Sequence, residues 1–178
     1  AFLIDRADMQ KRKIPKSLAL DGENSKFSIQ VENWMNAILG DVSFSVTTDY
    51  VKAITDIRYG NGLAGQPVLP TMTGVGISYI LSIVTAGLWC ASVEKATLMI
   101  ENPEAHLHPA AQSRMGKFLE CLADAGVQLI VETHSEHIID GARVQAAWMK
   151  RTAGIRIYFF SKEKDEIQVE NIQVDENG

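Results

Sequence analysis

Residues 96–112 read ATLMIENPEAHLHPAAQ, and this stretch decides the fold. A continuous apolar run ends at Glu101, and a proline, a second glutamate and two histidines follow it. An apolar run without alternation is typical of a strand buried in a parallel sheet, and Pro109 suits the first turn of a following helix. The stretch therefore predicts a strand, a polar turn and a helix. Acids and histidines this close together also indicate a chemical site.

The sequence that follows repeats this pattern. A helix that closes at Gly126 leads into a second apolar strand, VQLIVET, and SEHIIDGARVQAAWMK reads as a helix capped by Ser135. IRIYFFS and EIQVENIQV are two more strands, joined by the charged turn KEKDE. Strand, helix, strand, helix, strand predicts a parallel sheet covered by helices, with strands buried on both faces. Ligands bind at the carboxyl ends of such strands, where ENPEAHLH and ETHSEH both lie.

The sequence before this region predicts a helix, a hairpin and a long helix. The stretch DVSFSVTTDYVKAITDI alternates apolar and polar residues, which is typical of two strands in a hairpin. From Gly74 to about residue 90 the chain is apolar, but polar residues interrupt it, which favours a buried helix over a membrane span. The first helix is predicted from apolar residues at helical spacing that end before Gly40: Val31, Trp34, Met35, Ile38 and Leu39.

Composition limits the class of protein. A chain of 178 residues with 46% hydrophobic residues can form one compact domain with a real core. The formal net charge of −5 gives no overall basic balance that would indicate nucleic acid. Cys90 and Cys121 are too few for a disulfide framework or a cysteine zinc site, and we expect both in the core. Two cysteines without a disulfide framework suit a reducing cytoplasm, and the sequence shows no signal peptide.

The polar clusters allow two chemistries. In the first, Glu101 binds the Mg²⁺ of a nucleotide, Glu104 polarises the attacking water, and His134 contacts the terminal phosphate. In the second, histidines hold a metal ion, with Glu101, Glu104 and Glu132 completing the set. The spacing of neither HLH nor HSEH is a strong ligand motif, and packing around a turn is the simpler interpretation. The second chemistry uses all the histidines of the chain: His106, His108, His134 and His137.

The two motifs LMIENPEAHLHPAAQ and LIVETHSEHII, in this order, resemble the C-terminal half of ATPases of the ABC/SMC class. The pattern is similar to that of RecF-like and OLD-like bacterial ATPases of the AAA type. The resemblance implies a P-loop NTPase-like α/β fold, the ABC ATPase head, with parallel strands covered by helices and an added antiparallel β-hairpin. It also implies ATP and Mg²⁺ as cofactors, with Glu101 binding the metal, Glu104 as general base and His134 as the switch histidine.

The segment GVGISYILSIV falls where this class has its signature motif. The resemblance implies that Gly74, Gly76 and Ser78 contact a nucleotide held by a second subunit, since a helix N-terminus attracts phosphate. The sequence departs from the class at three positions. Glu101 stands where aspartate is usual, Gly74 or Thr73 takes the place of the signature serine, and Tyr79 stands where glutamine is common.

A phosphate-binding loop is not recognisable in the sequence. The nearest match, GNGLAGQP at residues 60–67, has Gln66 in place of the lysine and Pro67 in place of the hydroxyl residue. Glutamine supplies no positive charge to phosphates, and proline has no N–H to donate. We therefore expect the Walker A half to lie before this portion of the protein. The chain alone is expected to be inactive or very weak as an ATPase.

The resemblance also suggests an organisation and partners. It is loose over residues 1–70, whereas residues 71–178 carry the signature helix, the Walker B strand and the switch histidine. It implies a head-to-head homodimer that closes on ATP in the cytoplasm, without membrane contact, serving DNA maintenance or phage defence beside DNA or a nuclease. Two alternatives stay open: a metal-dependent hydrolase using the clustered histidines, and an assembly module without catalysis.

Overall fold

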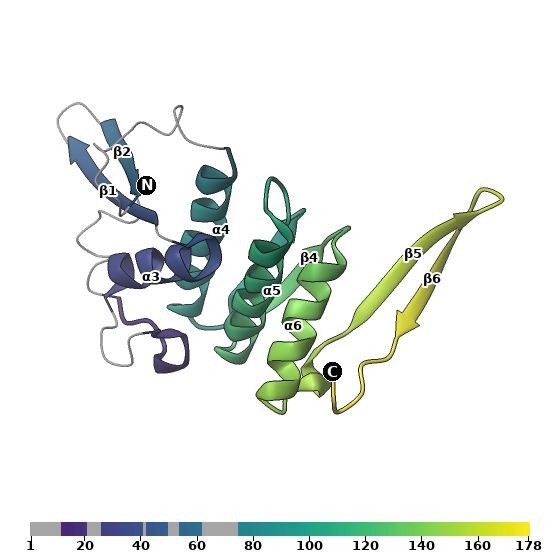
Figure 1. Cartoon of the computed structure of the whole chain (residues 1–178). Helices are drawn as coiled ribbons and strands as arrows, with labels where there is room; N and C mark the ends of the chain where they lie inside the picture. Colours follow the sequence, from purple (N-terminus) through teal and green to yellow (C-terminus); the bar gives the residue numbers. More distant parts are fainter. Residues whose placement is uncertain (1–11, 21–25, 41, 50–53, 62–74) are drawn as a thin grey trace.

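The computed structural model describes residues 12–20, 26–40, 42–49, 54–61 and 75–178 (Figure 1). Two parallel strands and the helices around them form the centre, one antiparallel hairpin comes before them in the chain, and a second follows them. The elements in chain order are η1 (Lys16–Leu18), α3 (Phe27–Leu39), β1 (Val42–Asp49), β2 (Ile54–Asn61), α4 (Val75–Ala91), β3 (Thr97–Glu101), α5 (Pro109–Asp124), β4 (Gln128–Glu132), α6 (Glu136–Trp148), η3 (Thr152–Gly154), β5 (Ile157–Glu163) and β6 (Glu166–Ile172).

The central unit is the predicted strand, helix and strand. β3 and β4 pair in parallel, with Thr97 opposite Gln128 at one end and Glu101 opposite Glu132 at the other. A parallel pair needs a crossover connection, and α5 supplies it. Its boundaries follow from the sequence, because Pro109 occupies the first turn and Gly126, with φ +94°, takes the left-handed conformation just beyond the helix.

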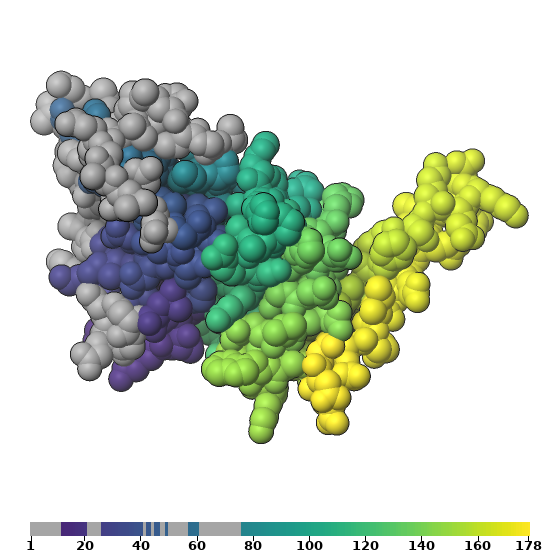
Figure 2. Space-filling view, viewed as in Figure 1, coloured from purple at the N-terminus to yellow at the C-terminus, as the bar shows by residue number. Residues whose placement is uncertain are grey.

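Both predicted hairpins are confirmed. β1 pairs with β2, and β5 pairs with β6, in each case antiparallel. The second hairpin turns through Lys164 and Asp165, whose φ angles of 47° and 71° are those of a two-residue loop with both central residues left-handed. The space-filling view shows this hairpin projecting from the rest of the molecule (Figure 2).

Two expectations about the central sheet are wrong. The fifth strand does not extend the parallel sheet, because the tight turn at residues 164–165 gives β5 the adjacent β6 as its partner. The central strands are also not buried on both faces. Ile100 points into the core and is 7% exposed, whereas Met99 and Ile130, on the opposite face, are 73% and 53% exposed. Among the described residues, the helices cover one face of this pair.

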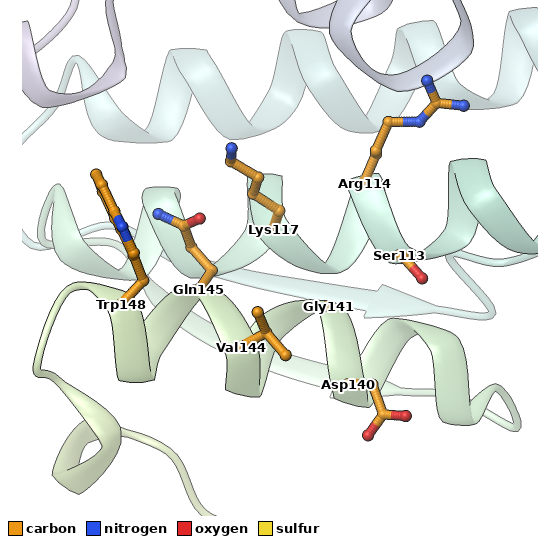
Figure 3. Close-up of a pocket in the computed structure, with 8 residues that line it drawn as sticks. All are labelled: Ser113, Arg114, Lys117, Asp140, Gly141, Val144, Gln145 and Trp148. Carbon is orange, nitrogen blue, oxygen red and sulfur yellow. The ribbon is translucent and has the colours of Figure 1, made fainter. Parts of the chain in front are cut away.

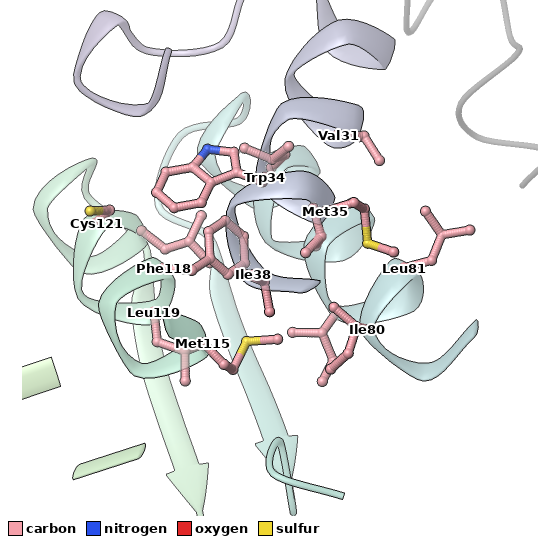
Figure 4. Close-up of a cluster of buried hydrophobic side chains, with 14 of the residues drawn as sticks. Val31, Trp34, Met35, Ile38, Ile80, Leu81, Met115, Phe118, Leu119 and Cys121 are labelled. Carbon is pink, nitrogen blue, oxygen red and sulfur yellow. The ribbon is translucent and has the colours of Figure 1, made fainter. Parts of the chain in front are cut away.

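The core lies between α3, α4 and α5 (Figure 4). Trp34 of α3 stacks against Phe118 of α5 with ring centroids 4.8 Å apart, and its indole N–H donates a hydrogen bond to the Leu18 carbonyl at 2.9 Å. The first helix predicted from the sequence spans 27–39 and ends at Gly40, whose φ is +82°.

Cys90 and Cys121 are buried free thiols, as predicted. The division of the chain at residue 70 stays a prediction, and α3 packs against both α4 and α5.

The helix α5 also packs closely against α6. Gly116 and Gly141 allow this approach, because a Cβ on Gly116 would collide with the Ile138 carbonyl and one on Gly141 would collide with the Ser113 carbonyl. The core packs against one side of α5 and α6 packs against the other, and these contacts fix the direction of α5.

Within the described residues, no helix has the length and apolar character needed to cross a bilayer.

Candidate functional site

The site is built on the carboxyl ends of β3 and β4. Glu101 and Glu132 are the last residues of these strands, they lie opposite each other, and both are exposed. The ladder continues one step further, because the Asn102 N–H donates to the Glu132 carbonyl oxygen at 2.9 Å. The two strands therefore end level with each other, as the sequence predicted, and the residues that follow them meet at one edge.

The connection from β3 to α5 is a compact double turn. The Ala105 N–H donates to the Asn102 carbonyl at 2.9 Å, and the Leu107 N–H donates to the Glu104 carbonyl at 3.0 Å. Asn102 and His106 have φ angles of 48° and 62°, which fold the chain back on itself. These turns hold Glu104 beside the end of β4.

Glu104 joins the two polar clusters. Its Oε2 accepts a hydrogen bond of 2.6 Å from the Thr133 hydroxyl, and its Oε1 accepts one of 2.8 Å from the His134 backbone N–H. A carboxylate offers about four lone-pair positions, so one remains on each oxygen. The predicted proximity of Glu104 and His134 is thus observed, through the backbone of His134.

A second set of hydrogen bonds supports this junction. Thr133 Oγ1 accepts from the Ser135 N–H at 3.1 Å, and the Ser135 hydroxyl lies 2.5 Å from Gln112 Oε1, to which it donates. Gln112 in turn donates to the Leu107 carbonyl at 2.8 Å. Ser135 also accepts from the Ile138 N–H at 3.3 Å, which confirms it as the cap of α6. Sequence analysis did not assign a role to Thr133 or Gln112.

The imidazole of His134 points toward the other strand-end acid. Its Nε2 lies 3.0 Å from Glu132 Oε1, and the two side chains are 82% and 51% exposed. An exposed pair of this kind is held weakly, so the ring is free to turn toward a ligand at the edge of the sheet. Glu132 was considered only as a possible metal ligand from sequence, although its place at the end of VQLIVE was a usable signal.

Tyr79 connects α4 to this edge. Its hydroxyl donates a hydrogen bond of 2.5 Å to the backbone carbonyl of Glu101. Burial raises the pKa of Tyr79 above 10.0, and the negative charges of Glu104, Glu101 and Glu132 raise the pKa further. Three carboxylates from two strand ends therefore face one tyrosine, which fills the position where the ABC/SMC class commonly has glutamine.

The beginning of α4 lies against the double turn. A Cβ on Gly76 would lie 2.9 Å from the His106 carbonyl oxygen, so only glycine fits without displacing the turn. Ser78 is half-buried, and its carbonyl accepts from the Ser82 hydroxyl at 3.1 Å. Gly74 lies outside the described residues, as does most of the segment at residues 60–67. The nucleotide contacts assigned to Gly74, Gly76 and Ser78 stay predictions.

The histidines do not form one cluster. His108 caps α5, accepting from the Ala110 N–H through Nδ1 at 3.4 Å, and His106 packs its backbone against Gly76. In the part of the chain that the structure describes, no group of three or more histidine, cysteine, aspartate or glutamate side chains is arranged to hold a metal ion. Carboxylate oxygens such as those of Glu101 are still the donors that Mg²⁺ prefers, since it takes one or two carboxylates together with phosphates.

The fold and this edge define the class of protein. Level parallel strands with acids at their carboxyl ends, helices over one face and a capped turn into α5 form the P-loop NTPase-like fold of an ABC-class ATPase head. The family model described as the AAA ATPase domain matches residues 5–139, more than half of the chain. The chain therefore belongs to the AAA ATPase domain family.

Three solved structures show the same fold at low sequence identity. An SMC ATPase, studied for ATP-driven dimerization and DNA-stimulated activation, aligns at TM-score 0.62 with 11% identity, over 83% of this chain and 84% of that one. An Smc head bound to the C-winged helix domain of ScpA aligns at 0.65 with 11% identity, over 84% and 43%. The Smc head with an extended coiled coil, bound to the C-terminal domain of ScpA from Pyrococcus furiosus, aligns at 0.62 with 13% identity, over 82% and 34%.

These identities show a shared fold and no more. The chain spans less than half the length of the second and third structures. Among curated protein sequences, none matches the chain.

Proposed function

We propose that the chain forms part of an ATP-hydrolysing head, with the nucleotide bound at the carboxyl ends of β3 and β4. The observation that carries this proposal is the bridge from Glu104 to Thr133 and His134. This bridge joins Glu104 to the backbone of His134, which supports pairing the proposed base with the proposed phosphate sensor. Membership of an ATPase family supports the same reaction.

Each residue of the junction has a defined task in this proposal. Glu101, at the end of β3, would hold Mg²⁺, which neutralises phosphate charge when bound. Glu104 would accept a proton from the attacking water through a lone pair that its two hydrogen bonds leave free. His134 would turn from Glu132 toward the terminal phosphate. Tyr79 would keep the backbone of Glu101 in place through its hydroxyl.

Two copies of the head would work together as a dimer. Gly74, Gly76 and Ser78, at the start of α4, would contact the nucleotide of a second copy through exposed N–H groups. Closure on ATP followed by hydrolysis would then open and close a head-to-head homodimer. The SMC ATPase to which the fold is similar undergoes ATP-driven dimerization.

The remaining assignments extend this proposal. The phosphate-binding loop would come from a preceding half of the protein, with residues 1–70 as a loosely related part of the head and 71–178 as its catalytic part. The protein would act in the cytoplasm on DNA maintenance or phage defence, with DNA or a nuclease as possible partners. DNA-stimulated activation is described for the similar SMC ATPase, which supports testing DNA first.

The test is ATP turnover by the intact protein. Glu104→Gln removes the base and keeps one acceptor oxygen, which can still accept from the His134 N–H, while the new NH2 group faces the Thr133 hydroxyl, which can turn to accept from it. We expect kcat to fall by about 100-fold or more. Glu170→Gln, which makes the same change on the distant strand β6, should leave kcat unchanged. Undiminished turnover in Glu104→Gln would remove that residue from the role of base. Nucleotide binding without turnover in the wild type would support an assembly module instead.

A further inference from the structure

An open groove runs between α5 and α6, separate from the ends of β3 and β4. Its volume is about 480 Å³, and Figure 3 shows the side chains that line it. The close approach of the two helices at Gly116 and Gly141 forms its base. The lining residues are Ser113, Arg114, Lys117, Asp140, Gly141, Val144, Gln145 and Trp148.

One wall of the groove is apolar and exposed. Val144 and Trp148 lie one turn apart on α6, and they are 69% and 81% exposed. A tryptophan this exposed leaves a large apolar surface in water, and such residues are the usual anchors of protein interfaces. The apolar wall follows the direction of the helix.

The opposite wall carries positive charge. Arg114 and Lys117 lie one turn apart on α5, and neither forms an ion pair within the described ranges. Asp140 is the only acid lining the groove, and Arg143 pairs with it at 3.1 Å. Its side chain points away from Arg114 and Lys117 in Figure 3. Both side chains line the groove, and Figure 3 shows them extending from α5 away from α6, so their positive charge lies along the α5 rim of the groove.

A buried polar group lies between the two walls. Gln145 is only 9% exposed, and its side-chain amide extends between Lys117 and Trp148 (Figure 3). Its polar atoms are not sealed from the groove, so water can satisfy them, and a docked segment can replace that water with a polar side chain.

We propose that this groove docks an acidic amphipathic helix of a partner protein. Cations one turn apart on α5 match carboxylates at helical spacing, and Val144 and Trp148 match the apolar face of the same helix. Gln145 would bond to a polar side chain between the two faces. A nucleic acid fits less well, because the groove has one aromatic residue beside an aliphatic one and the chain has a net charge of −5.

The apolar wall should provide most of the affinity. Exposed ion pairs contribute little to affinity, whereas a central tryptophan contributes more. Trp148 should therefore decide how tightly the helix binds. Arg114 and Lys117 should decide whether the groove selects an acidic helix over a basic one.

The test uses the whole 178-residue chain and two fluorescently labelled synthetic helical peptides. Both have leucines along one face, and the opposite face carries glutamates in one peptide and lysines in the other. Fluorescence anisotropy should show saturable binding of the glutamate peptide, at least ~10-fold tighter than that of the lysine peptide. Trp148→Ala should weaken binding of the glutamate peptide by about tenfold or more.

Charge variants test the selectivity. The double variant Arg114→Glu and Lys117→Glu should lose the preference for the glutamate peptide. Lys164→Glu, in the turn of the distant hairpin, should keep it. The proposal fails if the glutamate peptide does not bind, if Trp148→Ala binds it equally well, or if an oligothymidine binds in its place. The assay contains no nucleotide, so its outcome is independent of the proposed ATPase function.

Discussion

The carboxylate of Glu104 accepts hydrogen bonds from two residues that follow a different strand. Bonds to an ionised group are stronger than neutral ones, and here they join segments far apart in sequence. Both Glu104 and Thr133 are half-buried, so water competes only in part for these bonds. Glu104 therefore stabilises the fold independently of any chemistry at the site.

Thr133→Val measures this contribution. The substitution keeps the shape of the side chain but removes the hydroxyl, which donates to Glu104 Oε2 at 2.6 Å and accepts from the Ser135 N–H at 3.1 Å. We expect the free energy of unfolding, measured with urea, to fall by about 1–2 kcal/mol. Thr97→Val is the matched control, since it removes an exposed neutral bond to Gln128 and should cost less than about 0.5 kcal/mol. Equal losses in the two variants would contradict the special strength of the Glu104 bond.

Glu120 is a buried acid on α5, one turn after Gly116, on the face of the helix that packs against α6. Burial raises its pKa from 4.5 to about 7, Arg151 opposes this rise, and Asp124 adds to it. Because the folded protein keeps a proton that the unfolded chain loses, stability should fall as pH rises from 4.5 to about 7. Below pH 4.5 the full free energy of unfolding is retained. Above about pH 7, ionised Glu120 lowers it by on the order of 3 kcal/mol.

Glu120→Gln should remove this pH dependence, because the amide does not ionise. The variant should gain stability over the wild type at pH above 7 and differ little below pH 4.5. Thermal unfolding across this pH range provides the measurement. A wild-type slope that persists unchanged in the variant would show that another group causes it.

At the scale of elements, local signals predicted most of the fold. Pro109 and Ser135 marked helix starts, and Gly40 and Gly126 marked ends. Alternation of apolar residues marked the first hairpin, and the charged turn KEKDE marked the second. These signals act within a few residues, so they are visible in the sequence. The separation of β5 from the central sheet and the exposure of Met99 depend on distant neighbours, and the sequence predicted neither.

The residues of the candidate site could also be predicted only in part from the sequence. Glu101, Glu104 and His134 were visible because acids and a histidine at strand ends are rare and chemically specific. Thr133 and Tyr79 are ordinary residue types in strands and helices. Their roles follow only from three-dimensional contacts, with Glu104 in one case and with the Glu101 carbonyl in the other.

The packing of α5 on α6 depends on Gly116 and Gly141. The substitution Gly116→Ala tests this dependence. The added Cβ would collide with the Ile138 carbonyl, so the helices must separate or bend. We expect a loss of about 1–3 kcal/mol in the free energy of unfolding, as for other overpacked contacts. Gly154→Ala in η3, where nothing lies within 4 Å, is the control and should be nearly neutral. A neutral Gly116→Ala would show that the two helices adjust freely.

The molecule has a well-packed centre and an exposed hairpin, formed by β5 and β6. Neither β5 nor β6 packs extensively against another described element. Tyr158, Phe160, Ile167 and Val169 are 54%, 66%, 71% and 55% exposed. Phe160 lies directly opposite Val169, so these four side chains share one face. The other face carries three glutamates and also Phe159 and Ile172, which are 56% and 44% exposed. An isolated two-stranded hairpin is only marginally stable in water, so this face adds little to the stability of the centre.

This arrangement predicts that the apolar face of the hairpin can be changed without unfolding the molecule. The double variant Phe160→Lys and Val169→Lys should bind less of the hydrophobic dye ANS, because it removes exposed apolar surface. Its thermal unfolding midpoint should match that of the wild type, since the centre makes few contacts with this face. Gln168→Lys and Ser161→Lys, a facing pair on the opposite side, make the same charge change and should leave dye binding unaltered. A lower midpoint only in the Phe160 and Val169 variant would mean that this face packs against the centre.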